Sequence, residues 1–175
     1  MTWDAYNRRK TALRDMLALA DRQGGATLDA LLDTVPGARE AFDDPRIALF
    51  DAQMLFVQRV RGQVDMTVGD GLEAASVDPE DAVVDAWATT AQRMSGARLL
   101  LDAAEAEGDL TKAFAKERAL LATLAGVPPR HPELQAHGRR IRDRARELVD
   151  ERRAADLPEI PRNGFIDRLR SALAA

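Results

Sequence analysis

Segments of helical periodicity, each opened by a capping residue and closed by a breaking one, cover most of this chain. Asp44-Pro45 and Asp78-Pro79 both place an aspartate before a proline, which favours a helix start because aspartate caps free N–H groups and proline suits the first turn. Thr27 is a similar capping residue, and Gly24-Gly25 ends the segment before it. No segment alternates polar and apolar residues with the period of a strand. The pattern predicts an all-α fold, a single-domain helical bundle.

The same signals divide the chain into about eight or nine helices. The expected helices cover residues 3–22, 28–35, 45–68, 79–94, 97–107, 110–125, 133–155 and 165–173, with a short turn near 39–42. Residues 1–43 are expected to form a small N-terminal helical region, and residues 44–155 the helical core and dimerisation region. Residues 156–175 are expected to form a linker and a C-terminal helix that docks on the core or on a partner.

The composition narrows the class of protein. The chain has 175 residues and no cysteine, which excludes a disulfide framework, a thiolate nucleophile and a cysteine-based zinc site. Its net charge of −4 gives no overall attraction to nucleic acid. No apolar run approaches the roughly 20 residues that span a bilayer, and the N-terminal residues lack the apolar core of a signal peptide. We therefore expect a cytoplasmic protein without a membrane partner.

Charge is distributed in two blocks of opposite sign. Residues 62–92 contain no lysine or arginine but seven acids, whereas residues 139–146 contain five arginines and one aspartate. The simpler interpretation is two solvated faces that pair with each other or with neighbouring helices. The alternative is a site for a charged partner, or a contact that sets the register of a subunit interface.

Residues that usually carry catalysis are scarce. His131 and His137 lie six positions apart, which does not place them on one helical face, and Glu133 and His137 alone are too few ligands for a metal. Gly24-Gly25 indicates a helix stop, and Gly69-Asp70-Gly71 lacks the strand and lysine of a phosphate-binding loop. The sequence predicts a protein that is not an enzyme, with no metal and no cofactor.

Large apolar residues of the central segments have two interpretations. Phe50 and Met54 share one stripe of the segment 45–68 and Phe56 lies on another, so this helix is expected to be central. Together with Trp87 and Met94 of the next segment, they are candidates to line a pocket for an apolar small molecule. Residues of this kind at helical spacing are more typical of a packed core, and both interpretations stay open.

The last two long segments carry a narrow apolar seam. Leu134, Ile141 and Leu148 follow one another at heptad spacing, a pattern that suits the pairing of helices. Residues expected to form a homodimer interface through these two helices are Leu121, Leu124, Leu134, Ile141, Ala145 and Leu148.

The order of segments resembles that of TetR-family transcriptional regulators. The resemblance rests on a basic first segment at residues 8–13, on residues 24–28 with the short segment ending at Phe42, and on residues 43–50, which are similar to the entry of the family's fourth helix. It implies a TetR-like arrangement in which the first three helices bind DNA, later helices enclose a ligand, and the last two form a dimeric four-helix bundle.

The chain departs from the family in the DNA-reading region. Residues 26–42 are about five residues shorter than the family's pattern, which truncates the recognition helix. Candidates for nucleic-acid contact are Arg8, Arg9, Lys10 and Arg39, whose alternative interpretation is ordinary solvated surface. The expected function is a TetR-like regulatory or small-ligand-binding protein, a homodimer, with weak or lost DNA binding.

A second function of a different class is also consistent with the sequence. In it, the chain is a helical interaction module, an adaptor or assembly subunit, that captures a protein partner through its charge blocks and its C-terminal arm. A ligand-sized cavity beside Trp87 and Met54 would favour the ligand-binding function, whereas a solid core there would favour the interaction module.

Overall fold

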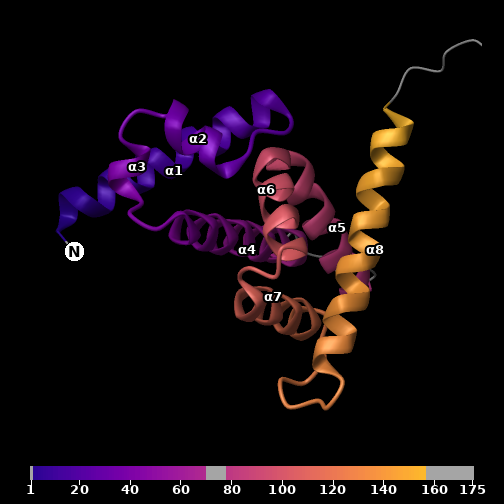
Figure 1. Ribbon diagram of the computed structural model, residues 1–175. Coiled ribbons are helices and arrows are strands. Elements are labelled where there is room, and N and C mark those ends of the chain that lie inside the picture. Colours follow the sequence, from indigo (N-terminus) through magenta and orange to yellow (C-terminus); the bar gives the residue numbers. More distant parts are fainter. Residues whose placement is uncertain (1, 70–77, 157–175) are drawn as a thin grey trace, which may run out of the picture.

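The computed structural model describes residues 2–69 and 78–156, and these residues form helices joined by short loops (Figure 1). The helices are α1 (Trp3–Gln23), α2 (Leu28–Thr34), α3 (Ala38–Ala41), α4 (Pro45–Gly69), α5 (Pro79–Arg93), α6 (Ser95–Ala106), α7 (Thr111–Leu124) and α8 (Leu134–Ala155). The described part of the chain contains no strand, so the predicted all-α class is confirmed. The predicted helix at 165–173 lies outside the described residues.

The capping signals act as the sequence predicts. Asp78 accepts hydrogen bonds from the N–H groups of Glu80 at 2.7 Å and Asp81 at 3.4 Å, with Pro79 in the first turn of α5. Asp44 accepts a 2.9 Å bond from the N–H of Arg46 at the start of α4. Local hydrogen bonds of this kind depend on a few adjacent residues, so they can be predicted from sequence alone.

The boundary between α5 and α6 differs from the prediction because its cap comes from elsewhere in the chain. Ser95 and Gly96, expected to be a break, form the first turn of α6. Asp21 near the end of α1 accepts a 2.6 Å hydrogen bond from the N–H of Gly96. A Cβ atom at Gly96 would lie 2.3 Å from the backbone carbon of Ala20, so only glycine allows α6 to approach α1 this closely.

Helix α4 is central, as predicted, and contacts α1, α2, α5, α6 and α7 (Figure 1). Its buried face carries Leu49, Phe56 and Val60, the second of the two predicted stripes. The first stripe is not buried throughout, since Phe50 and Met54 are 45% and 41% exposed. The prediction that α4 packs on both sides is therefore wrong at these two positions.

Helices α7 and α8 pack closely against each other within one chain (Figure 1). Gly138 makes the contact possible, because a Cβ atom there would lie 1.8 Å from the carbonyl oxygen of Arg118. Ile141 and Ala145 of α8 are fully buried against this neighbour and α5. No helix among the described residues is both long enough and apolar enough to cross a membrane.

Candidate functional site

A buried carboxylate, Glu117 on α7, fixes the position of Trp87 in the core. Its Oε1 accepts a 2.8 Å hydrogen bond from the indole N–H of Trp87 on α5. Its Oε2 accepts a 2.8 Å bond from the side-chain amide of Gln53 on α4. Since Glu117 is only 2% exposed, these bonds replace the water that its charge has lost. The ring of Trp87 also meets Phe56 edge to face, with centroids 5.5 Å apart.

Arg98 on α6 is a buried cation beside the same aromatic rings. Its guanidinium carbon lies 5.0 Å from the ring centre of Phe56, 5.5 Å from that of Trp87 and 6.0 Å from that of Phe114. Nε donates a 3.1 Å hydrogen bond to Asp102 one turn later. Nη1 and Nη2 make no hydrogen bond within the described residues, although Nη2 lies 3.0 Å from the Asp102 carboxylate. The rings attract the cation but do not satisfy its terminal N–H groups.

Two carboxylates of α6 bind arginines of α7 and α8. Asp102 accepts a 2.6 Å hydrogen bond from Nη2 of Arg146. Glu105 accepts bonds of 2.7 Å from Arg142 and 3.1 Å from Arg146, and Arg118 lies 3.5 Å away from it. Together with Arg98, four guanidinium groups therefore share two carboxylates at this junction of three helices.

Burial, hydrogen bonds and neighbouring charges shift the pKa values of Glu105 and Arg118 in this cluster. Burial works against ionisation of Glu105, but the hydrogen bonds from Arg142 and Arg146 outweigh it and hold its pKa below the ordinary value. Burial and the neighbouring charge of Arg142 lower the pKa of Arg118, despite the attraction of Glu105. Positive charge is thus in local excess.

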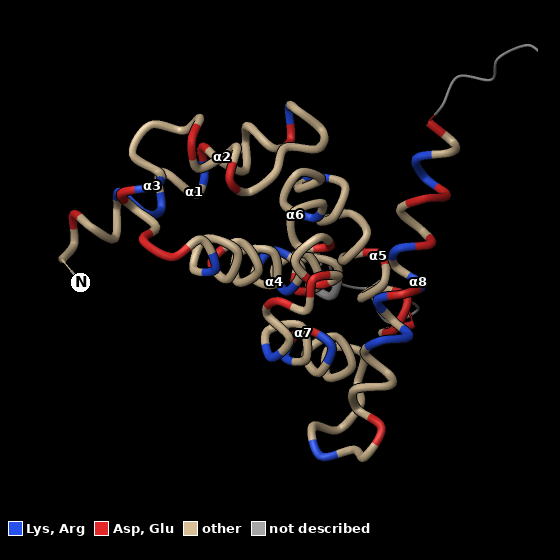
Figure 2. Tube along the Cα trace, in the orientation of Figure 1, with Lys and Arg blue, Asp and Glu red and all other residues tan. Residues whose placement is uncertain are grey.

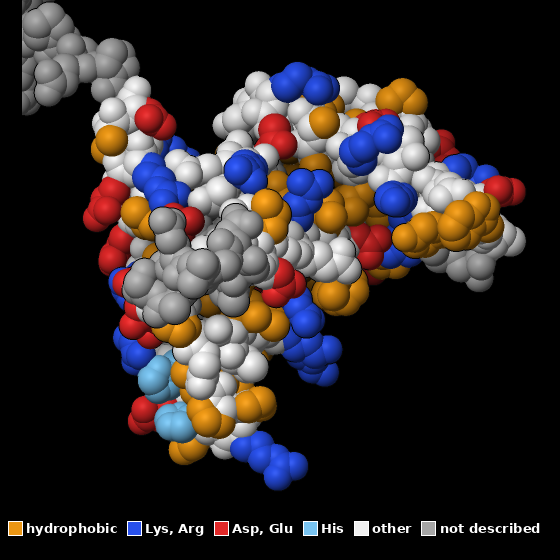
Figure 3. All heavy atoms as spheres, turned by 180° about the vertical axis from the view of Figure 1, so that it is seen from behind, with side chains coloured by type: hydrophobic (Ala, Val, Ile, Leu, Met, Phe, Trp, Pro, Cys, Tyr) orange, Lys and Arg blue, Asp and Glu red, His pale blue; other side chains and the backbone are white. Residues whose placement is uncertain are grey.

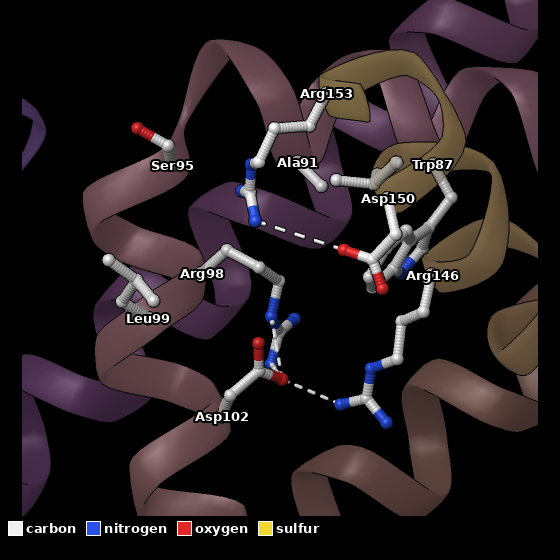
Figure 4. Close-up of a pocket in the computed structure, with 10 residues that line it drawn as sticks. Trp87, Ala91, Ser95, Arg98, Leu99, Asp102, Arg146, Asp150 and Arg153 are labelled. Carbon is white, nitrogen blue, oxygen red and sulfur yellow. Dashed lines mark hydrogen bonds and ion pairs between the residues drawn. The ribbon is translucent and has the colours of Figure 1, made fainter. Parts of the chain in front are cut away.

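A pocket of about 200 Å³ opens beside this cluster, between α5, α6 and α8 (Figure 4). Its lining residues are Trp87, Ala91, Ser95, Arg98, Leu99, Asp102, Arg146, Val149, Asp150 and Arg153. In the close-up, Arg146 and Arg98 converge on Asp102, while Arg153 approaches Asp150 at 3.8 Å. The lining therefore combines apolar side chains with several charged groups.

The acidic and basic blocks of the sequence meet across α5 and α8 (Figure 2). Arg144 donates hydrogen bonds of 2.7 Å to Glu80 and 2.8 Å to Asp81, which raise the pKa of its guanidinium. Farther along α8, Arg152 binds Asp85. The simpler interpretation of the blocks holds here, because these charges pair with each other inside one chain. A shallow hollow of about 410 Å³ lies over these exposed pairs.

The residues predicted to line a pocket do not form one group. Trp87 lines the pocket, but Phe56 is packed against it inside the core and Met94 is buried as well. Phe50 and Met54 are on the exposed side of α4 and take no part in the pocket. The predicted group is therefore wrong as a single site, because α4 turns its two apolar stripes in different directions.

Of the basic residues predicted to contact nucleic acid, three lie on α1. Arg8 and Lys10 are exposed. Arg9 is held in place, since its Nε donates a 2.8 Å hydrogen bond to Asp51 on α4 and its guanidinium carbon lies 5.4 Å from the ring centre of Phe42. Of these three, only Arg8 and Lys10 form no ion pair with other described residues.

The fourth, Arg39, lies on α3, the helix to which the TetR resemblance would assign DNA recognition. This helix is a single turn, Ala38–Ala41. Arg39 binds Asp33 and lies 3.5 Å from Asp29, and the hydrogen bond with Asp33 raises the pKa of its guanidinium. A cation held by two carboxylates is poorly placed to bind phosphate or a base edge.

Residues predicted to form a dimer interface serve the fold of one chain instead. Leu121, Ile141 and Ala145 are buried within it, so their assignment to an intersubunit surface is wrong. Leu124 and Leu148 pack against the same core, and Leu134 is half-buried at the start of α8. The heptad seam pairs α8 with helices of its own chain.

The two histidines lie closer together than their sequence spacing suggests. The rings of His131 and His137 meet edge to face with centroids 5.4 Å apart, because the loop folds back onto the first turn of α8 (Figure 3). Nδ1 of His137 lies 2.7 Å from Arg140, and Nδ1 of His131 accepts a bond from the N–H of Glu133. The described residues contain no group of three or more side chains that suits a metal.

Sequence reasoning missed the polar residues that build the site, Arg98, Asp102 and Glu117. One signal was present, because Glu117 falls between Phe114 and Leu121 on the buried stripe of α7. A charged residue in such a stripe indicates a buried partner. Comparisons with protein-family models, with curated proteins and with solved structures each found no match to this chain.

Proposed function

We propose that this chain is a non-enzymatic helical protein that binds a small molecule in the pocket between α5, α6 and α8. The observation that carries the proposal is the composition of the pocket lining, in which fixed charged side chains adjoin apolar ones. Trp87, only 1% exposed, is held by Glu117 and borders the pocket, and Leu99 adds an exposed apolar side chain. A concave site that places polar groups at defined positions beside apolar surface is typical of sites for small ligands.

A fragment screen by saturation-transfer NMR tests this function. We expect compounds that bind the wild type to bind Leu99→Ala more weakly, since Leu99 lines the pocket and is 48% exposed. Met66→Ala is the matched control, because Met66 is also an exposed apolar residue but lies outside the pocket. Equal binding by the two variants would place the ligands elsewhere and contradict the proposal.

We further propose a TetR-like regulatory role in which DNA binding is weak or lost. The single-turn α3 and the pairing of Arg39 with two aspartates support this part. Fluorescence anisotropy with a labelled random duplex, at two salt concentrations, tests it. We expect no binding beyond the weak, salt-sensitive level of non-specific association. Tight binding that Arg39→Ala abolishes would contradict it.

A second candidate function, self-association or capture of a protein partner, is favoured by exposed aromatic side chains. Trp3 and Tyr6 stack on each other at 5.7 Å near the start of α1. The ion pair between Arg9 and Asp51 brings this end of α1 to the part of α4 that exposes Phe50. Figure 3, in which this end of the molecule is at the right, shows hydrophobic side chains gathered there.

Light scattering coupled to size exclusion tests this second candidate as a homodimer. We expect the wild type to elute as a dimer and Phe50→Ser to shift it towards monomer, since exposed aromatic surface drives association. Met66→Ser is the matched control and is expected to leave the dimer intact. A monomeric wild type would contradict self-association. A dimer lost only when residues 156–175 are removed would assign the contact to the C-terminal arm.

A further inference from the structure

The charges that line the pocket do not balance. Three arginines and two aspartates face it, which leaves one positive charge in excess. The excess is not cancelled behind the pocket, because the two arginines there, Arg118 and Arg142, are matched by only two carboxylates, Glu105 and Glu117. A group of this composition attracts a single negative charge.

The floor of the pocket contains a cation with unused donors. The side chain of Arg98 is only 7% exposed, and its Nη1 and Nη2 make no hydrogen bond within the described residues. Its one carboxylate neighbour, Asp102, is shared with Arg146, whose guanidinium lies nearer the mouth. These two nitrogens are closed to solvent, so an acceptor would reach them only after a local rearrangement of the lining. It would then be bound favourably, because buried N–H groups of a guanidinium are costly to leave without acceptors.

The apolar part of the lining comes from all three helices. Trp87 and Ala91 are buried and border the pocket with little surface, Val149 is half-buried, and Leu99 is 48% exposed. An apolar group bound against Leu99 would remove this surface from water. The volume of about 200 Å³ lies below that of pockets for drug-sized molecules, which limits the ligand to a small one.

We propose that the pocket binds a small organic monocarboxylate, with its carboxylate beside Arg146 and Arg98 and its apolar body against Trp87 and Leu99. This inference rests on the proposed ligand-binding function and names its ligand class. A guanidinium group pairs with a carboxylate through two parallel hydrogen bonds, a geometry that an amide or an ammonium group does not reproduce.

Three probes of similar size separate charge from apolar contact: benzoate, benzamide and benzylamine. Each is titrated by calorimetry into the full chain, and by fluorescence into Trp3→Phe, in which Trp87 is the only tryptophan. We expect benzoate to change the Trp87 emission in a saturable way and to bind at least about tenfold more tightly than benzamide. Benzylamine is expected to bind least, because its charge has the sign of the pocket. Inorganic phosphate is titrated as a fourth probe.

Two arginines of α8 provide a matched pair of variants. Arg146→Gln removes two ion pairs at the pocket, and Arg144→Gln removes two ion pairs on the other side of the helix. We expect the first to weaken benzoate binding about tenfold or more and the second to leave it unchanged. Asp150→Asn adds one unit of positive charge to the lining and is expected to tighten benzoate binding.

The outcomes distinguish the ligand class from the proposed function. If benzamide binds as tightly as benzoate, the inference of a carboxylate fails while the pocket stands as a ligand site. If phosphate competes with benzoate at equal affinity, the site selects anions in general and the organic carboxylate is wrong. If no probe binds and the fragment screen also finds nothing at the pocket, the proposed function fails together with the inference.

Discussion

The indole N–H of Trp87 and the buried carboxylate of Glu117 are joined by a 2.8 Å hydrogen bond between α5 and α7. The bond fixes the ring whose other side borders the pocket. Its acceptor, the Glu117 carboxylate, is almost closed to water, so removing the indole donor would leave a buried oxygen unpaired and lower the free energy of unfolding. The rigidity of the pocket wall and the stability of the core therefore depend on the same contact.

Replacing Trp87 with phenylalanine tests this dependence. The change leaves one oxygen of Glu117 without its donor and opens a small cavity, and we expect it to lower the free energy of unfolding by about 2–4 kcal/mol. Trp3→Phe is the matched control, since Trp3 is 74% exposed, and its effect is expected to stay within about 0.5 kcal/mol. Urea unfolding followed by circular dichroism measures both. Equal effects would contradict the role of the buried bond.

Glycine substitutions test the close contact between α7 and α8. Gly138→Ala places a Cβ where the backbone of Arg118 already lies, and we expect a loss of about 3 kcal/mol or more from forced separation of the two helices. Gly62 is also inside a helix, but a Cβ atom there would meet nothing within 4 Å, so Gly62→Ala is expected to stabilise by about 0.5–1 kcal/mol. If α7 and α8 are in close contact at Gly138, thermal unfolding will show a lower melting temperature for Gly138→Ala and a higher one for Gly62→Ala.

The pKa of Glu105 gives the stability a defined acid dependence. Its pKa is lower in the folded chain than its ordinary value of 4.5, so the ionised form stabilises the fold. This contribution is complete above about pH 4.5 and is lost as the pH falls through the folded pKa. We expect Glu105→Gln to be less stable at pH 7 and to show a shallower loss of stability between neutral and acid pH.

Glu107→Gln provides the control for this acid dependence. Glu107 lies at the end of the same helix, is exposed, and forms no ion pair with other described residues. Urea unfolding at a series of pH values is expected to give this variant the wild-type profile. A profile of Glu105→Gln that runs parallel to the wild type would show that the ion pairs of Glu105 do not set the acid dependence.

Arg142 and Arg144 of α8 differ in burial, so their replacement should lower the free energy of unfolding by different amounts. The side chain of Arg142 is 7% exposed and binds Glu105, so Arg142→Gln is expected to lower the free energy of unfolding by about 3 kcal/mol. Arg144 is nearly half exposed, and Arg144→Gln is expected to cost less than about 1 kcal/mol, an effect that salt reduces further. Chemical unfolding at low and high salt checks both. Similar costs would contradict the assignment of a buried cluster beside α6.

The helices were predictable because their signals are local. Asp44, Asp78 and the glycine stop at Gly24 each act on neighbouring residues, and the predicted limits of the helices within residues 2–69 and 78–156 agree with the structure to within about two residues. The pairing of the charge blocks was also predicted as one interpretation. The start of α6 was not, because its cap is Asp21, a residue distant in the sequence.

The candidate site was less predictable because periodicity identifies a face but not the neighbour that covers it. Phe50 and Phe56 have the same chemistry, yet one is exposed and the other is fully buried. The seam containing Ile141 was correctly identified as a packing surface but assigned to a second subunit, since spacing does not distinguish a helix of the same chain from that of another. Arg98 carried one local signal, the spacing of four residues to Asp102 on the same helix, but its aromatic neighbours come from three other helices and could not be predicted from sequence.

The bond between Asp21 and Gly96 has a mechanical consequence. It anchors the first turn of α6 to α1, and the contact at Gly96 leaves no room even for a methyl group. The α6 side of the pocket is therefore held in a fixed position. The α8 side is different, because its tight backbone contact is at Gly138, near the opposite end of that helix from Arg153 (Figure 1). Beyond that point Ile141 and Ala145 are buried against α7 and α5, and ion pairs of Arg146 and Arg152 tie the rest of the helix to its neighbours. A change in the width of the pocket would therefore require movement of the last turns of α8 rather than of α6.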